Sequence, residues 1–560
     1  MRAGTGESAC WAHDGSSSPI YRRQQYPSEY ALKRGKDVND SDGAGLPPPL
    51  SGSDCVTGTT RFLTKPRLRE RAIQRSHPRH RSYQMEGLLK RKGHKLANLR
   101  RSLGAIETFG FSLSVTAPTL AMAFTTILTA RSAGRAAPIA YLIGGAAVTL
   151  VALSFVAFGR QIAHAGSVYA YVGSVFGPRW GFVAGWALLL MYVTLLAGST
   201  ALAGNFGAAG LGHAGIAGPN IWLIVAIFSA FFAVWLTWRD MQLAARLMLV
   251  LEAVSVLAIL LLAIVVLTRV PLSLLPFKPE PDRGWAGIGD GIVFAVLAFA
   301  GFEGATTLGE ETKNPGRSIP KAVLGTVIAA TLFYVLVSYA QIVGYGLDHV
   351  QALSQASAPL DELSTRFISG TFAGFLDFAA ATSSLACAIG CLSAAARMLY
   401  ALSRSGLAPS LAEVDVKHGT PARSIFVLGA VNLVCLLLWG VRSDATSYSG
   451  NIVMIGTLAL ILVYVSVTGA QAINACHDRR PAWWTIGSLG AVLLLWPLWN
   501  SLYPAPPWPG NVWPYVVAAW LALGALIVFL RPSAVRFEFM PPKPSGDLSR
   551  ESEFPGHLPL

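Results

Sequence analysis

Twelve long apolar runs are the feature of this sequence that most constrains its fold. Each run is bounded by charged residues, proline or glycine, and crossing the hydrocarbon core of a bilayer takes about 20 mostly apolar residues per helix. A segment in lipid must satisfy its own backbone hydrogen bonds, which an α-helix does. The predicted spans are 106–130, 138–159, 180–204, 219–237, 243–268, 287–308, 320–344, 371–393, 424–441, 452–472, 484–502 and 512–530. The sequence therefore predicts an all-α integral membrane protein with about 12 transmembrane helices.

The composition excludes a soluble globular protein of this size. Of the 560 residues, 53% are hydrophobic and only 13% are charged, and the mean hydropathy is +0.48. The net charge of +14 is concentrated at one end, because residues 1–101 hold 20 Lys and Arg against 9 Asp and Glu. This excess lies in a basic tail, and the rest of the chain contains no basic domain. No nucleic-acid partner is therefore expected.

Residues 1–100 have the composition of a disordered segment. They are rich in Arg, Ser, Gly, Pro and His, and they contain no apolar run that could form a core, a signal peptide or a span. We expect a basic cytosolic tail there, a transmembrane domain at 101–531 and a second cytosolic tail at 532–560. The arginines of the first tail could bind anionic lipid or nucleic acid, although a solvated charge run is the more common case. Alternatively, translation starts at Met85 and leaves a short basic leader.

Loop charges set the expected orientation in the membrane. An even number of spans puts both termini on one side, and the loops on that side hold thirteen Lys and Arg against seven on the other. Cytoplasmic loops carry the excess of Lys and Arg in membrane proteins. Both termini are therefore predicted to be cytoplasmic, in a multi-pass protein of the plasma (inner) membrane.

The sixth predicted span carries a carboxylate in its middle. Glu303 lies between Gly301 and Gly304, and a charged side chain near the centre of a membrane helix costs roughly 2.5–3.5 kcal/mol on insertion scales. Glu303 is therefore expected to face protein, water or a ligand rather than lipid. The glycines alone could simply allow close packing of a neighbouring helix. Together with the carboxylate, they indicate a functional site in an interrupted helix.

The first span has a comparable interruption. Pro118 stands in mid-helix, where it frees a carbonyl group, and Ser114, Thr116 and Thr119 supply hydroxyls nearby. A kink of this kind is, on its own, more often structural. Interrupted helices one and six, five spans apart, are however the sequence pattern of an inverted-repeat transporter with its site at the bilayer midplane.

The spacing of the two interruptions predicts a 5+5 inverted repeat. The repeats would cover about 105–268 and 287–472, with two appended helices at about 484–530. The two halves share no residue-level identity, so the repeat is inferred from spacing alone.

Coupled transport needs a group that changes charge. Glu252 in the fifth span has apolar neighbours on both sides, so its carboxyl group can exchange a proton with bulk water during a transport cycle. The alternative is a structural hydrogen bond to a neighbouring helix. Glu303 is a second proton candidate, and Ser383 and Ser384 in the eighth span could help to form an ion site. Protons are favoured over sodium as the coupling ion.

Three stretches of the chain form a set of motifs in a fixed order. They are AGSVYAY at 165–171, then FAGFE, EETKNP and IPKA within 299–322, and ARMLYALSRSGLAP at 396–409. Together they resemble the amino acid-polyamine-organocation (APC) superfamily of permeases over roughly residues 100 to 530. The chain departs from that pattern in helix one, where many members have a Gly-Ser-Gly-like break and this chain has Thr-Ala-Pro at 116–118.

The resemblance implies a small amino acid or amine held by the unwound backbone of helices one and six. Free N–H groups at a half-helix N-terminus suit a carboxylate, and free carbonyls at a half-helix C-terminus suit an ammonium group. The residues expected near the carboxylate are Ser114, Thr116 and Ala117. Those expected near the ammonium group and side chain are Phe299, Ala300 and Gly301, with Phe299 or Phe302 as an aromatic lid.

The predicted function is secondary active transport of amino acids, by symport or antiport, through alternating access around this midplane site. A permease for polyamines or other organic amines is the alternative, since Glu303 suits a cation. A membrane enzyme is less favoured, because the scattered histidines form no HExxH or nucleophile-base spacing. ATP-driven transport is also less favoured, because the sequence contains no GxxxxGK[ST] loop. The scattered cysteines suit small buried hydrophobes, so no metal or cofactor is expected. Neither the substrate nor the oligomeric state follows from the sequence.

Overall fold

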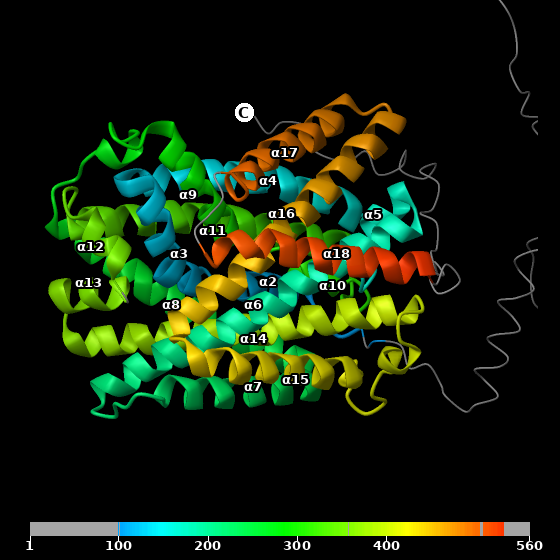
Figure 1. Ribbon diagram of the computed structural model, residues 1–560, viewed down its shortest axis with the longest axis horizontal. Coiled ribbons are helices and arrows are strands. Elements are labelled where there is room, and N and C mark those ends of the chain that lie inside the picture. Colours follow the sequence, from blue (N-terminus) through cyan, green and yellow to red (C-terminus); the bar gives the residue numbers. More distant parts are fainter. Residues whose placement is uncertain (1–98, 100, 357, 504–507, 531–560) are drawn as a thin grey trace, which may run out of the picture. The chain divides into compact units, whose positions relative to one another are not determined.

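The structure, a computed structural model, describes residues 99, 101–356, 358–503 and 508–530 (Figure 1). All of them lie in one unit of the chain, Tyr83–Leu560. The predicted tails at 1–100 and 532–560 fall outside the described residues, apart from residue 99. The alternative start at Met85 falls outside them as well.

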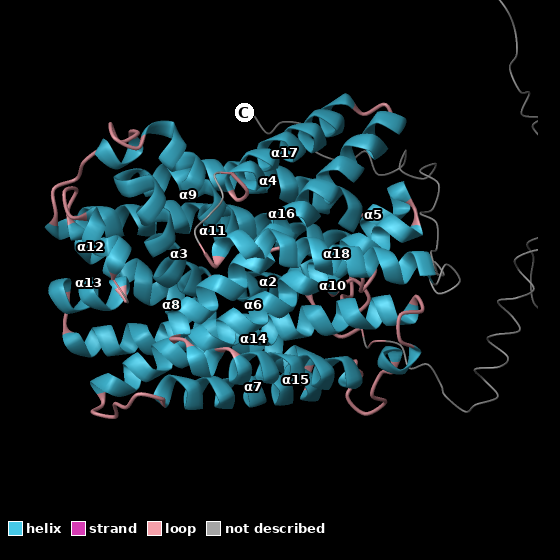
Figure 2. Ribbon diagram, viewed as in Figure 1, coloured by secondary structure: helices cyan, strands magenta, loops and turns pink. Residues whose placement is uncertain are grey.

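The described residues form helices joined by short loops, with no strand among them (Figure 2). The α-helices are α2 (Ala105–Thr116), α3 (Pro118–Ala133), α4 (Ala137–Gly159), α5 (Val168–Phe176), α6 (Pro178–His213), α7 (Ile221–Arg239), α8 (Met241–Arg269), α9 (Gly284–Ala298), α10 (Gly304–Thr307), α11 (Pro315–Tyr345), α12 (Val350–Gln355), α13 (Pro359–Phe367), α14 (Gly370–Arg404), α15 (Ala422–Leu438), α16 (Ala445–His477), α17 (Pro481–Asn500) and α18 (Trp513–Leu530). The apolar runs explain this architecture, because a backbone in lipid has to bond within its own helix.

Ten helical stretches of the described chain are long and apolar enough to cross a membrane. The prediction of an all-α, multi-pass membrane protein is thus confirmed. Two features separate this number from the predicted twelve. The first two predicted spans lie in one 55-residue helical stretch, Ala105–Gly159, and the sixth is shortened to the 15 residues of α9. The count of twelve and the inverted repeat stay predictions.

Helices α6, α14 and α16 form the centre of the bundle. Helix α6 packs along both α14 and α16, and α14 is buried over almost its whole membrane-spanning length. Small residues allow this close packing, since a Cβ added to Gly198 of α6 would lie 2.3 Å from Val453 of α16. Helices α7 and α15 run side by side along one edge (Figure 1), where large side chains such as Phe228 and Leu438 are exposed. In a membrane these side chains face lipid.

The two ends of the bundle carry different short elements. Helices α12 and α13 lie at one end and α5 lies at the other (Figure 1). At the α5 end, the segment before helix one pairs with the segment after α10. Leu103 N donates to Glu311 O at 3.1 Å, and Lys313 N donates to Leu103 O at 3.0 Å. These bonds join the start of helix one to the end of helix six.

Candidate functional site

Helix one breaks between α2 and α3 at Ala117. Pro118 has no N–H and begins α3, and Ala117 takes a left-handed backbone conformation with a φ of +46°. Ala117 N still donates to Leu113 O at 2.9 Å. The carbonyl of Val115 accepts a hydrogen bond from Cys387 Sγ of α14 at 3.2 Å. A second helix thus replaces part of the interrupted hydrogen-bond ladder.

Helix six breaks between α9 and α10. Gly301 has a φ of +105°, which favours glycine, and a Cβ at this position would lie 2.7 Å from the carbonyl oxygen of Val115. Ser112 Oγ of α2 donates to Phe302 O at 2.7 Å. The two breaks therefore touch each other, and the close approach depends on the missing side chain of Gly301.

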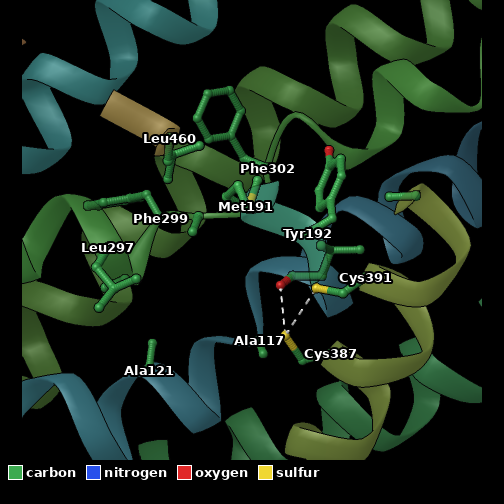
Figure 3. Packing of buried hydrophobic residues seen from close by; sticks show 14 of the residues in the cluster. Ala117, Ala121, Met191, Tyr192, Leu297, Phe299, Phe302, Cys387, Cys391 and Leu460 are labelled. Carbon is green, nitrogen blue, oxygen red and sulfur yellow. Dashed lines mark hydrogen bonds between the residues drawn. The ribbon is translucent and has the colours of Figure 1, made fainter. Parts of the chain in front are cut away.

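A small cavity of about 40 Å³ lies beside both breaks. Its lining residues are Val115, Thr116, Ala117, Leu120, Ala121, Phe124, Thr125, Leu195, Ser199, Leu202, Leu297, Ala298, Ala300, Cys387 and Val453. Ala117, Ala121, Leu297 and Cys387 surround the same space in Figure 3. Ligand sites usually enclose about 300–1,000 Å³, so these walls must move apart to admit a substrate.

Three of the seven predicted substrate residues line this cavity, namely Thr116, Ala117 and Ala300. Their contribution is mainly backbone, because Thr116 Oγ1 donates to Ser112 O of its own helix at 2.9 Å. Ser114 is buried outside the lining, and its Oγ has no hydrogen-bond partner among the described residues. Gly301 also lies outside the lining, at the contact between the breaks.

The two phenylalanines predicted as a lid pack into the protein instead of lining the cavity. The ring of Phe299 lies 5.0 Å from that of Tyr334. The ring of Phe302 packs edge-on against Phe155 at 5.6 Å and also contacts Tyr464 at 5.4 Å. In Figure 3 the ring of Phe302 points away from Ala117 and Ala121. Both side chains are completely buried.

Glu252 of α8 lies at the start of α3, on the other side of the helix-one break. Its side chain is fully buried, and Oε1 accepts a hydrogen bond from Thr119 N at 3.0 Å. The first backbone donors of a helix have no partner within the helix and carry a partial positive charge, so they attract an anion. Glu252 therefore places its carboxylate where an unwound helix one would offer N–H groups to a ligand.

The two serines predicted as ion ligands in α14 have different surroundings. Ser383 Oγ accepts from Leu120 N at 3.3 Å, so it occupies the next free donor of α3. Because Pro118 has no N–H, Glu252 and Ser383 together take up the open donors of the first turn. Ser384 Oγ donates to Ala380 O of its own helix at 2.7 Å.

Glu303 lies at the helix-six break, but its side chain bonds away from the cavity. Oε2 accepts from Tyr464 of α16 at 2.9 Å and from Gly301 N at 3.2 Å. The residue is fully buried and is absent from the cavity lining. Its carboxylate therefore supports the backbone turn that it belongs to.

Sequence reasoning missed a buried ion pair at the α5 end of the bundle. Arg397 of α14 binds Glu311 through two parallel hydrogen bonds, one of them 2.9 Å long from Nη2 to Oε2. Both side chains are nearly fully buried. Both residues lie in the motif stretches of the sequence and could have been singled out there. Only the fold shows that they form a pair. This pair connects α14 to the segment after α10.

A second charged group lies beside this pair. Arg404 donates to both oxygens of Glu310, at 2.8 and 3.1 Å, and its Nη2 lies 2.9 Å from His164 Nε2. Burial lowers the pKa of His164 to about 4, and the charge of Arg404 acts in the same direction. Burial acts to raise the pKa of Glu310, but the hydrogen bonds and charge of Arg404 outweigh it and hold that pKa below its usual value.

A helical membrane bundle in which two broken helices meet beside a buried cavity is the architecture of a secondary transporter. The chain belongs to the amino acid permease family, whose model matches residues 112–496. It is therefore an amino acid permease.

The chain is also similar to individual transporters. The chain is 27% identical to the branched-chain amino acid permease of Bacillus subtilis (strain 168) over 403 residues, 66% of this chain and 81% of the relative. It is 26% identical to the branched-chain amino acid permease of Lactococcus lactis subsp. cremoris (strain MG1363), over 54% of this chain and 69% of the relative. It is also 26% identical to the methylthioribose transporter of B. subtilis (strain 168), over 78% of this chain and 94% of the relative.

Proposed function

We propose that this permease is a secondary active transporter of neutral amino acids with aliphatic side chains, and that it works by alternating access around the cavity beside the two breaks. The observation that carries the proposal is the lining of that cavity. None of the described residues that line it is charged, and most of its side chains are aliphatic.

The substrate side chain would contact the apolar walls contributed by Leu195, Leu202, Leu297 and Val453. Burying such a side chain stabilises the complex in proportion to its apolar area. A polyamine or cationic amino acid would instead need a carboxylate in the wall, and the bonds of Glu303 direct its carboxylate elsewhere. Two of the relatives are branched-chain amino acid permeases, which agrees with an aliphatic substrate.

The polar ends of the substrate would bind to backbone. Thr116 and Ala117 supply the helix-one side of the cavity, where the carboxylate of the substrate would lie near the start of α3. Ala300 supplies the helix-six side, close to the end of α9, where carbonyl groups suit an ammonium group. This division of roles follows the direction of the two helix dipoles.

Glu252 would make transport depend on protons. Its carboxylate already occupies the N-terminal turn of α3, so a substrate carboxylate arriving at the same turn would meet a second negative charge. Protonation of Glu252 removes that repulsion. A proton and a substrate would therefore enter together, which makes symport the natural mode and leaves Ser383 as a supporting acceptor.

Alternating access would require opening of the α5 end. There the start of helix one is held by the bonds between Leu103 and the segment around Glu311, and Glu311 is held by Arg397. Breaking these contacts would let the α2 end of helix one move away from α10. With both termini cytoplasmic in the plasma membrane, as loop charges predict, this end opens to the cytosol.

Uptake into proteoliposomes tests the proposal. The purified chain is reconstituted and offered labelled leucine, valine, glutamate, lysine and putrescine, each with an inward proton gradient, an inward sodium gradient or no gradient. We expect accumulation of leucine and valine with the proton gradient only. Accumulation of putrescine or lysine in preference to leucine would overturn the substrate class, and sodium-driven accumulation would overturn the coupling.

A further inference from the structure

Three side chains that could bind a metal meet at the α12–α13 end of the bundle, far from both breaks. His213 ends α6, Asp361 lies in α13, and Asp377 lies in the second turn of α14. His213 Nε2 lies 3.2 Å from Asp361 Oδ1 and 3.5 Å from Asp377 Oδ2. The three possible ligand atoms all lie within 4.8 Å of one another.

Asp377 is the informative member of this cluster. Its side chain is 95% buried, being only 5% exposed, inside a membrane-spanning helix. A carboxylate in that setting needs a partner of opposite charge. The Nε2 atom of His213 carries at most one hydrogen, and its hydrogen bond goes to Asp361. Among the described residues, Asp377 is left with the 3.5 Å contact between its Oδ2 and His213 Nε2, and with no hydrogen bond of standard geometry.

The chemistry of the three ligands selects a type of cation. An imidazole nitrogen with two carboxylates suits Zn²⁺ and its first-row neighbours, whereas Ca²⁺ and Mg²⁺ prefer oxygen ligands alone. Tetrahedral Zn²⁺ with bonds of about 2.0–2.1 Å has ligand-to-ligand edges of about 3.3–3.4 Å. The distances of 3.2 and 3.5 Å from His213 Nε2 to the two carboxylates already match such edges. His213 is 36% exposed, which leaves a path for water as the fourth ligand.

We propose that His213, Asp361 and Asp377 form a binding site for Zn²⁺ that joins α6, α13 and α14 at the end of the bundle opposite α5. A small inward shift of Asp361 and Asp377 toward one point completes the ligand set. The metal also places a permanent positive charge next to the buried Asp377 carboxylate, which has no hydrogen bond of standard geometry among the described residues.

The site would restrain the connection between α11 and α14. Helix α13 is also attached to α11, because Tyr345 Oη donates to Glu362 Oε2 at 2.6 Å and Arg366 Nη1 donates to Gly344 O at 3.1 Å. A metal bound to Asp361 would fix this segment to α6 and α14 as well. If the permease opens at this end during its cycle, Zn²⁺ inhibits it. This consequence rests on the proposed transport function, whereas metal binding does not.

Metal binding is tested directly on the purified full chain in detergent. Zn²⁺ is titrated calorimetrically, and Co²⁺ is added in a parallel sample because tetrahedral Co²⁺ with such ligands absorbs visible light. We expect one site per chain in the unaltered protein. Loss of one ligand, in His213→Ala or Asp377→Asn, should weaken binding at least about 10- to 100-fold, since even outer-shell changes have effects of that size.

Two variants at the same end serve as matched controls. His349→Ala removes another histidine near α12, and Glu362→Gln removes the carboxylate next to Asp361, and both should leave Zn²⁺ affinity unchanged. Asp361→Asn gives a further ligand variant if Asp377→Asn does not fold, because Asp361 is less buried. Equal affinity in the unaltered protein and in the folded ligand variants, or no site at all, overturns the proposal.

The transport arm separates this inference from the proposed function. Zn²⁺ should lower leucine uptake in proteoliposomes of the unaltered protein, a chelator should restore it, and His213→Ala should be insensitive. A protein that binds Zn²⁺ at this site but transports no amino acid would keep the metal site and refute the proposed function. A protein that transports leucine but still binds Zn²⁺ in the His213→Ala variant would keep the proposed function and refute the metal site.

Discussion

The two helix breaks are supported in different ways, although each has a buried glutamate beside it. At the helix-one break, the carboxylate of Glu252 comes from α8 and takes a backbone donor of α3. At the helix-six break, Glu303 belongs to the break itself and bonds back to Gly301 N and to Tyr464. A carboxylate on a separate helix can respond to a ligand at the break, whereas one within the turn mainly maintains the turn. We therefore propose that Glu252 couples transport to protons and that Glu303 maintains the turn.

The largest expected effect comes from changing Glu252, and not Glu303, to the corresponding amide. Glu252→Gln keeps the size of the side chain but cannot carry a proton through the cycle. Proton-driven accumulation of leucine should fall to the background level, while counterflow exchange continues. Uptake and counterflow are measured in the same proteoliposomes. Glu303→Gln is the matched comparison, and it should retain proton-driven accumulation. The opposite outcome for the two variants would reverse our assignment.

The second prediction concerns the contact between the breaks. Gly301→Ala adds a Cβ about 2.7 Å from the carbonyl oxygen of Val115 and also strains the backbone by about 1–3 kcal/mol. We expect a lower melting temperature in detergent and a large loss of uptake. Gly284→Ala is the control, because its φ of +56° is also positive but nothing lies within 4 Å of the added Cβ. If both variants lose the same stability, backbone strain alone explains the effect and the contact is unimportant.

A smaller effect is expected from the hydrogen bond to Glu303. Tyr464→Phe removes the hydroxyl that donates to Glu303 Oε2, and a typical hydrogen bond contributes about 0.5–1.5 kcal/mol to stability. Oε2 keeps its second bond, which Gly301 N donates. Stability in detergent should fall, while the order of preference among substrates stays the same. Tyr448→Phe on the same helix is the control, since its hydroxyl has no hydrogen-bond partner among the described residues. A changed substrate preference in Tyr464→Phe would place Glu303 in the substrate site.

The last prediction concerns the pH dependence of stability, to which the loop after helix two contributes. The pKa of His164 is lowered from 6.5 to about 4 in the folded protein, so the unfolded chain binds more protons between these values. Stability should therefore decrease as pH falls from about 6.5 toward 4. Melting temperatures across this range should show a weaker pH dependence in His164→Gln. The lowered pKa of Glu310 acts in the same direction but only below about pH 4.5, which separates the two groups.

Much of the fold and the position of the breaks could be predicted because they leave local signals. Long apolar runs predict helices, Pro118 removes a donor, and the glycines around Glu303 mark a loosened helix. Glu252 could be found because a carboxylate stands out among apolar residues. These features depend on single residues and their neighbours in sequence.

The walls of the cavity could not be predicted from sequence. Leu195, Leu202 and Val453 are indistinguishable from ordinary core residues until α6 and α16 are placed beside the breaks. The orientation of Phe302 could not be predicted either, since a phenylalanine at a break can face a ligand or pack inward. In the structure its ring packs inward, against the ring of Phe155. The cluster around His213 joins residues about 150 positions apart, so no spacing motif could reveal it.

The cysteine at the cavity gives the protein a natural reporter group. Cys387 lines the cavity, and its thiol donates to Val115 O at the helix-one break. A small thiol-reactive reagent can reach it only while the walls are apart. Once the other five cysteines, Cys10, Cys55, Cys391, Cys435 and Cys476, have been replaced by serine, the speed of alkylation at Cys387 measures how often the permease opens, and a bound substrate should shield it.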